Sequence, residues 1–292
     1  MLSRLGLPAI VLVLTACAPH GSPSDGPIRV VAAENVWGSV VAQIGGERVR
    51  VRSIVSDPNA DPHEFESDVV TARAVADARY VVINGAGYDA WAEKLLDANP
   101  VAHRDVLSAG DVVGKRPGDN PHLWYEPGYV QRVADRIAAD LSRIDPAGRA
   151  YFRSRRDRFA RDCAPYRARI AAIRMRFAKK PLGATEDVVA YLTAAAGLDL
   201  TTPTAFMQAV ANGTEPPTGA LLQLHRQLDS HAIRVLLYNV QTSTSVTSDI
   251  RARARASRIP VVTVTETIVP PDGRFEDWQL DQTRRLEAAL KS

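Results

Sequence analysis

The stretch IRVVAAENVWGSVVAQIGGERVRVRSIV, residues 28–55, decides the fold. Its first part, 28–34, is an apolar run typical of a strand, and its last part, 49–55, alternates apolar and polar residues as a strand does. Between them, 37–46 has helical spacing and ends on two glycines, which is a helix stop signal. A strand, a helix and a strand in this order predict a parallel sheet with helices on its faces.

The same alternation continues along the chain and resumes after a long helical tract. It therefore predicts two βα lobes of similar size, each with a parallel sheet. The further strands are expected at 79–85, 104–107, 181–186, 198–203, 232–239 and 259–266. The further helices are expected at 67–78, 88–98, 128–144, 187–198, 217–231, 245–258 and 275–292.

The tract between the two halves has helical spacing over 147–180, and Pro165 is its one interruption. An unbroken helix of that length measures about 45–50 Å, far more than a crossover within one lobe needs. Two interpretations remain: one rigid helix that joins the lobes, or two ordinary helices broken at the proline. The expected domains are a lobe at 28–145, a linking helix at 146–180 and a lobe at 181–292.

The N-terminus predicts export from the cytoplasm. An apolar run from Leu5 to Leu14 is about half the length that spans a bilayer and has the size of a signal-peptide core. It ends in LTAC, which resembles a bacterial lipobox. We therefore expect a signal peptide at 1–16, lipidation of Cys17 and a flexible tether at 17–27, on the outer side of the membrane or in the periplasm. The alternative is a plain secretory signal with an incidental cysteine.

Composition narrows the function classes further. The net charge is only +3 and the basic residues are dispersed, which argues against a nucleic-acid partner. The chain has two cysteines, Cys17 and Cys163, so a lipidated Cys17 leaves no disulfide framework. Stability must come from a hydrophobic core, which 46% hydrophobic composition can supply.

Side chains that can bind a metal follow predicted strands in both halves. In SDPNADPHEFESD, two prolines stiffen the loop around a single histidine. Ligands bind at the carboxyl ends of strands in open α/β sheets. Two imidazoles and two carboxylates suit a divalent transition metal. The candidates, two from each half, are His63, His122, Glu186 and Glu266.

Each candidate also has a simpler interpretation. A lone histidine near a strand end is more often a surface residue, and Glu186 stands where a helix N-cap would. Asp277 is a rival to Glu266 for the fourth position. Asn239 and Gln241 end a buried strand and are candidates for orienting a ligand side chain.

The motifs together resemble the metal-binding receptors of bacterial zinc/manganese ABC importers, the TroA-like or cluster A-I solute-binding lipoproteins. The similarity covers about residues 28 to 290 and rests on DPHEFE, NPHLWYEP, the arginine-rich helix, TEDVVAYLTAAAGL and VTETIVPP. It implies two βα lobes joined by one rigid helix, with the metal in the cleft between them. The ligands implied are His63, His122, Glu186 and Glu266. The last is a departure, since that position is usually Asp.

The resemblance implies a receptor rather than an enzyme. It would capture Zn²⁺ or Mn²⁺ and deliver the ion to a membrane permease with its ATPase, as a lipid-anchored monomer. The alternatives are a metal-dependent surface adhesin and a metallohydrolase. Four protein ligands leave no open position for a catalytic water, and the chain has no HExxH or GxSxG motif, which disfavours the hydrolase. The choice among Zn²⁺, Mn²⁺ and Fe²⁺ stays open.

Overall fold

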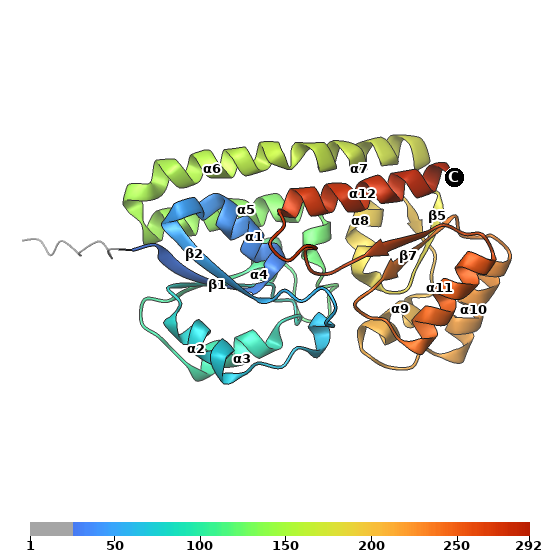
Figure 1. Cartoon of the computed structure of the whole chain (residues 1–292), viewed down its shortest axis with the longest axis horizontal. Coiled ribbons are helices and arrows are strands. Elements are labelled where there is room, and N and C mark those ends of the chain that lie inside the picture. The colour runs from blue at the N-terminus through green and yellow to red at the C-terminus, as the bar shows by residue number, and fades with distance from the viewer. Residues whose placement is uncertain (1–25) are drawn as a thin grey trace, which may run out of the picture.

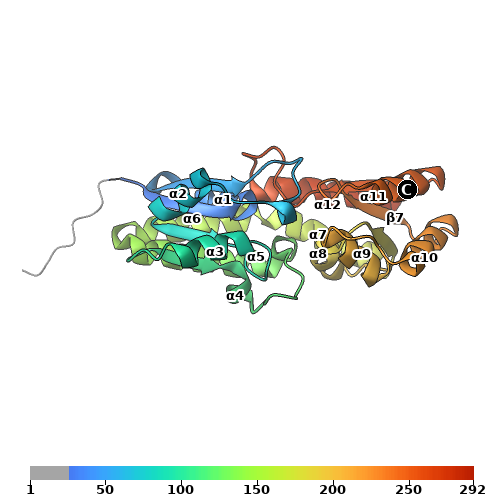
Figure 2. The ribbon, with the colours of Figure 1, turned by 90° about the horizontal axis from the view of Figure 1, so that it is seen from below.

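A computed structural model describes residues 26–292. It has two α/β lobes side by side, with long helices running along one side of both (Figures 1 and 2). This confirms the predicted fold class. The predicted signal peptide, Cys17 and most of the predicted tether lie outside the described residues.

Both lobes contain a four-stranded parallel sheet with the same strand order. The first sheet has the order β2-β1-β3-β4 and the second β6-β5-β7-β8. In each sheet the strand that comes second in the sequence lies at one edge, and the third and fourth strands lie on the other side of the first. The order of the strands therefore reverses beside β1 in the first sheet and beside β5 in the second. The strands are β1 (Ile28–Glu34), β2 (Val49–Val55), β3 (Tyr80–Ile83), β4 (Asp105–Ser108), β5 (Pro181–Ala184), β6 (Asp199–Leu200), β7 (Val235–Asn239) and β8 (Val261–Val264).

Helices surround the two sheets. Two short helices, α4 (Ala109–Val113) and α9 (Thr204–Ala211), were not predicted from the sequence, because each has too few residues for a clear apolar period. The helices outside the long tract are α1 (Asn35–Gly45), α2 (Val69–Asp77), α3 (Ala90–Ala98), α4 (Ala109–Val113), α5 (Pro127–Ile144), α8 (Ala190–Ala195), α9 (Thr204–Ala211), α10 (Thr218–Asp229), α11 (Ser245–Ala256) and α12 (Phe275–Lys291).

The long tract forms two consecutive helices, α6 (Arg149–Asp162) and α7 (Ala164–Phe177). They follow each other in nearly the same direction, α6 beside the first lobe and α7 beside the second (Figure 1). The single residue between them is the buried Cys163. Pro165 stands in the first turn of α7, where its missing N–H breaks no helical hydrogen bond. The tract is therefore interrupted, as the two-helix interpretation predicts. The two helices nevertheless continue in nearly the same direction, as the interpretation of one joining helix predicts.

The chain crosses between the lobes three times. It crosses first on α6 and α7, returns through residues 265–274, and crosses again on α12, which packs against α7 and β8. The returning segment is tied to the first lobe by Asn35, which donates to the Ile268 carbonyl (3.1 Å) and accepts from the Ile268 amide (3.0 Å). The lobes are therefore held together by more than one linker.

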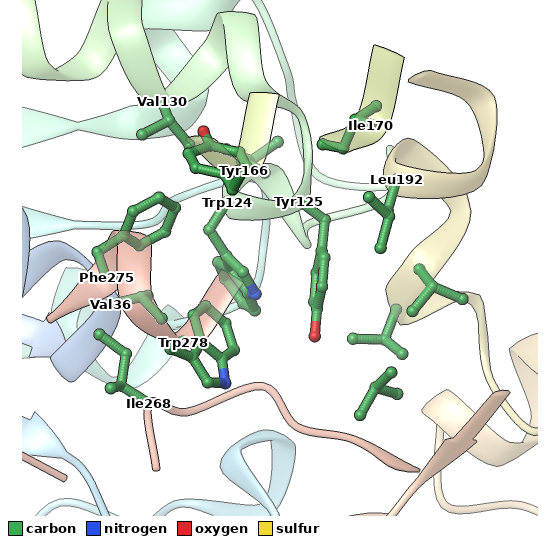
Figure 3. Close-up of a cluster of buried hydrophobic side chains, with 14 of the residues drawn as sticks. Val36, Trp124, Tyr125, Val130, Tyr166, Ile170, Leu192, Ile268, Phe275 and Trp278 are labelled. Carbon is green, nitrogen blue, oxygen red and sulfur yellow. The ribbon is translucent and has the colours of Figure 1, made fainter. Parts of the chain in front are cut away.

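One hydrophobic core extends through both lobes. Aromatic rings fill its centre, where Trp124, Tyr125 and Trp278 lie side by side (Figure 3). A second, smaller core lies under α2 and α3, on the other face of the first sheet. Among the described residues, none of the helices is both long enough and apolar enough to span a membrane.

We expect Phe275→Ala to lower the free energy of unfolding by about 3–5 kcal/mol. Its fully buried ring lies within 6.2 Å of the ring centres of Phe159, Tyr166 and Trp278, so truncation leaves a cavity where α12 meets the long helices. Chemical denaturation measures the change. The control is Met175→Ala in α7, whose side chain is 82% exposed and should change stability by less than about 0.5 kcal/mol. Equal effects of the two variants would contradict this account of the core.

Candidate metal centre

Four side chains from four loops converge between the lobes, and we call them the ligand cluster. Each offers one ligand atom, and these atoms all lie within 4.8 Å of one another. Two of the loops follow strands of the first sheet and two follow strands of the second. The members of the ligand cluster are His63, His122, Glu186 and Glu266.

The four histidine-to-glutamate distances within the ligand cluster are those expected around a small cation. His63 Nε2 lies 3.5 Å from Glu186 Oε1 and 3.2 Å from Glu266 Oε2. His122 Nε2 lies 3.6 and 3.3 Å from the same two oxygens. Four donors placed about 2.1 Å from a tetrahedral ion would be separated by about 3.4 Å. The measured separations bracket this value.

The ligand cluster is enclosed and its facing atoms are poorly satisfied. His122, Glu186 and Glu266 are fully buried, whereas the side chain of His63 is 20% exposed. The two Nε2 atoms and Glu186 Oε1 are buried without a hydrogen-bond partner. Buried polar atoms are costly unless something satisfies them, and a divalent cation held by all four side chains would do so.

Local structure fixes how each histidine is presented. His63 stands in a single 3₁₀ turn, Pro62–Glu64, whose N-cap Asp61 accepts a hydrogen bond from the His63 amide (2.9 Å). His122 Nδ1 lies 3.0 Å from Asn120 Oδ1, and the Asn120 side-chain nitrogen donates to the Asp187 carbonyl. The oxygen of Asn120 must therefore face His122, so Nδ1 carries the hydrogen and Nε2 keeps its lone pair for a metal.

Both carboxylates are oriented by hydrogen bonds. Glu186 immediately precedes a 3₁₀ turn, Asp187–Val189, but its side chain caps no backbone N–H and instead accepts from Asn239 and Thr242. Glu266, which follows β8, accepts from Asn239 and from the hydroxyl of Tyr88. The helix-cap interpretation of Glu186 is therefore wrong for its side chain.

Gln241 connects the two loops that carry His63 and Glu266. Its side-chain nitrogen donates to the Ala60 carbonyl of the first lobe (2.8 Å). Its side-chain oxygen accepts from the backbone amides of Glu266 (2.6 Å) and Thr267 (3.1 Å). One buried amide therefore fixes the positions of two loops from opposite lobes.

The carboxylates dominate the electrostatics of the ligand cluster. Burial lowers the pKa of His63, but the close approach and the negative charges of Glu186 and Glu266 outweigh burial and raise that pKa to about 11. Burial raises the pKa of Glu266, but the close approach of the His122 and His63 imidazoles holds it well below its ordinary value.

Aromatic side chains wall the ligand cluster on the side of the first lobe. The ring centre of Tyr88 lies 5.0 Å from that of His63 and 5.8 Å from that of His122. Trp124 packs edge-on against His122 at 5.5 Å. These rings keep water from the buried side of the cluster.

The structure brings together all four side chains that the sequence singled out as ligands, and it places Asn239 and Gln241 beside them. Asp277 lies apart, exposed in the first turn of α12. Sequence reasoning missed Tyr88, Thr242 and Asn120. The available signals were weak: Tyr88 follows the loop after β3, and Asn120 opens the same NPH motif that carries His122.

Residues 30–289 match the family described as ZnuA, zinc-uptake complex component A, periplasmic. The manganese-binding lipoprotein MntA of Halalkalibacterium halodurans is 27% identical over 161 residues, 52% of this chain and 53% of that protein. The manganese ABC transporter substrate-binding lipoprotein PsaA of Streptococcus pneumoniae is 28% identical over 163 residues, 51% of this chain and 52% of that protein. The chain thus spans about half the length of these curated relatives.

Solved structures share the fold. The SBP FpvC of Pseudomonas aeruginosa, in complex with Ni²⁺, superimposes with a TM-score of 0.75 at 19% sequence identity. The match covers 91% of this chain and 97% of that chain. At this identity the likeness concerns the arrangement of the two lobes.

Proposed function

The chain belongs to the ZnuA family of periplasmic zinc-uptake components, and from this premise we propose that it is a receptor outside the cytoplasm that captures one divalent transition-metal ion. The observation that carries the proposal is the ligand cluster, in which each histidine Nε2 lies 3.2–3.6 Å from an oxygen of both glutamates in a buried site. The relatives named for manganese and the family named for zinc support a cargo of Zn²⁺ or Mn²⁺.

Capture depends on the loop that carries His63. The other three members of the ligand cluster are fully buried, so an ion reaches them past the partly exposed imidazole. The hydrogen bond from Gln241 to Ala60 holds this loop against the second lobe. In this proposal the loop lifts to admit or release the ion while the lobes keep their positions.

The partner in this proposal is a membrane permease of an ABC importer with its ATPase, since PsaA is named as the substrate-binding lipoprotein of such a transporter. The predicted signal peptide at 1–16 and lipidation of Cys17 would keep the receptor, as a monomer, at the membrane surface. Residues 28–145 and 181–292 are proposed as its lobes and 146–180 as the linking helix.

We also propose that the chain performs no catalysis. A catalytic metal needs an open coordination position for water. Here four protein side chains surround one point, and three of them are completely buried. A closed site of this kind suits binding and delivery of an ion.

The direct test is metal stoichiometry. Residues 18–292, stripped of metal and titrated in the presence of a competing chelator, should bind one equivalent of Zn²⁺ tightly, because one cluster holds four ligand atoms within 4.8 Å. Elemental analysis of the purified protein gives an independent count. An absence of binding at micromolar metal, or several weak equivalents, would contradict the proposed receptor.

A further inference from the structure

Asn239 lies between the two carboxylates of the ligand cluster because of the strand order of the second sheet. β7 pairs with β5 on one side and with β8 on the other. Asn239 is the last residue of β7, Glu186 follows β5 and Glu266 follows β8. The side-chain nitrogen of Asn239 lies 2.6 Å from Glu186 Oε2 and 2.7 Å from Glu266 Oε1. Its two hydrogens are thus divided between the two carboxylates.

The orientation of this amide is fixed. Its oxygen accepts a hydrogen bond from the backbone amide of Gln241 (3.1 Å), so its nitrogen must face the carboxylates. The backbone amide of Asn239 donates to Thr185 Oγ1 (3.1 Å), and the residue is only 1% exposed. Rotation of the side chain would lose three hydrogen bonds inside the protein.

Asn239 binds one oxygen of each carboxylate and turns the other oxygen toward the histidines. Glu186 Oε2 accepts from both Asn239 and Thr242 (2.8 Å), so its acceptor positions are filled, while Oε1 faces the histidines without a partner. Glu266 Oε1 accepts from Asn239, and Oε2 faces the histidines and accepts from Tyr88 (2.7 Å). Each glutamate therefore directs one oxygen at the histidines, Oε1 of Glu186 and Oε2 of Glu266, and holds the other oxygen on Asn239.

We propose that Asn239, assisted by Thr242 and Tyr88, selects the metal by holding both glutamates in one-oxygen coordination. Two imidazole nitrogens and two single oxygens make a four-donor site, which suits tetrahedral Zn²⁺. Mn²⁺ favours more oxygen ligands in an octahedral arrangement, which the second carboxylate oxygens would have to supply. This inference rests on the proposed receptor function and assigns Zn²⁺ as the better-fitting cargo. Asn239 is a positioning residue, because it acts through the glutamates.

The test compares two ions in three variants. Asn239→Leu keeps the size of the side chain and removes both donors, and Thr242→Val removes one donor from Glu186 alone. Gln227→Leu is the matched control, because it removes an amide hydrogen bond to the Thr201 carbonyl in the same lobe, away from the ligand cluster. The dissociation constants of Zn²⁺ and Mn²⁺ are measured by competition with chelators. The visible absorption of bound Co²⁺ reports coordination number, since four-coordinate Co²⁺ absorbs more strongly than six-coordinate Co²⁺.

The wild-type protein and Gln227→Leu should show the intense Co²⁺ spectrum. In Asn239→Leu the ratio of the Mn²⁺ to the Zn²⁺ dissociation constant should fall by about 10–100-fold, the size of effect that an outer hydrogen-bonding partner has on metal affinity. The Co²⁺ absorption should weaken with it. Thr242→Val should show a smaller fall in the same ratio of dissociation constants. If Asn239→Leu fails to fold, the ratio measured for Thr242→Val tests the inference in its place.

Equal weakening of both ions with an unchanged Co²⁺ spectrum would overturn the inference and leave Asn239 with a purely structural role. A six-coordinate Co²⁺ spectrum in the wild-type protein would also overturn it. In both cases the protein still binds metal and the proposed receptor function stands. Absence of binding by the wild-type protein is a different result, in which the proposed function fails and this inference fails with it.

Discussion

His122→Ala is expected to weaken Zn²⁺ binding by about two to three orders of magnitude. Zinc held by four protein ligands is bound with about 10–16 kcal/mol, so one ligand accounts for about 3 kcal/mol. His122 is fully buried and its Nε2 faces both glutamates, so its removal takes one ligand atom out of the closed cluster. Competition with a chelator of known affinity measures the loss. His63→Ala should act in the same direction.

The control for His122→Ala is His225→Ala. His225 lies in α10, outside the ligand cluster, so its removal should leave the Zn²⁺ affinity unchanged. Circular dichroism of both variants establishes that the fold is retained, which separates lost coordination from unfolding. If His122→Ala bound Zn²⁺ as tightly as the wild-type protein, the assignment of the ligand cluster would be wrong.

Metal binding should raise the melting temperature by about 10 °C when free Zn²⁺ is about a thousandfold above its dissociation constant. A ligand that binds only the folded state stabilises it by about 4 kcal/mol at that excess. In a protein of this size each kcal/mol shifts the midpoint by about 2–4 °C. The ion binds only the folded state because its four ligands come from four loops that only folding brings together. Calorimetry with and without Zn²⁺ measures the shift.

The same scan on the double variant His63→Ala/His122→Ala provides the comparison. With both imidazoles gone, Zn²⁺ should shift the midpoint by no more than about 1 °C. An equal shift in the double variant would mean that the ion stabilises the protein from another site. A missing shift in the wild-type protein would show that zinc does not bind the folded state.

Much of the fold could be predicted from the sequence because its signals are local. β1 and β2 have the bounds that the apolar run and the alternation predict. The burial of a strand determines which of its own residues are apolar, so the strand can be recognised from its local sequence. His63 and His122 were recognisable because each follows a proline in a loop after a strand. The strand order and the pairing of the lobes have no such local signal.

The residues that orient the ligands were harder to predict. Thr242 and Asn120 are ordinary polar loop residues until the fold places their side chains against Glu186 and His122. The choice between Glu266 and Asp277 also needed the structure. The structure leaves Asp277 exposed in the first turn of α12, whereas Glu266 is fully buried. Hydrogen bonds between distant segments leave no period in a sequence, so only the three-dimensional arrangement reveals them.

The triple crossing between the lobes has a consequence for affinity. A receptor whose halves swing together around an ion spends part of its binding free energy on ordering them. Here α6 and α7, the returning segment 265–274 and α12 already restrain the two lobes. The ligands are therefore preorganised. In the proposed receptor, most of the coordination energy would then appear as affinity, and the entropy cost of binding would fall on the few residues of the His63 loop.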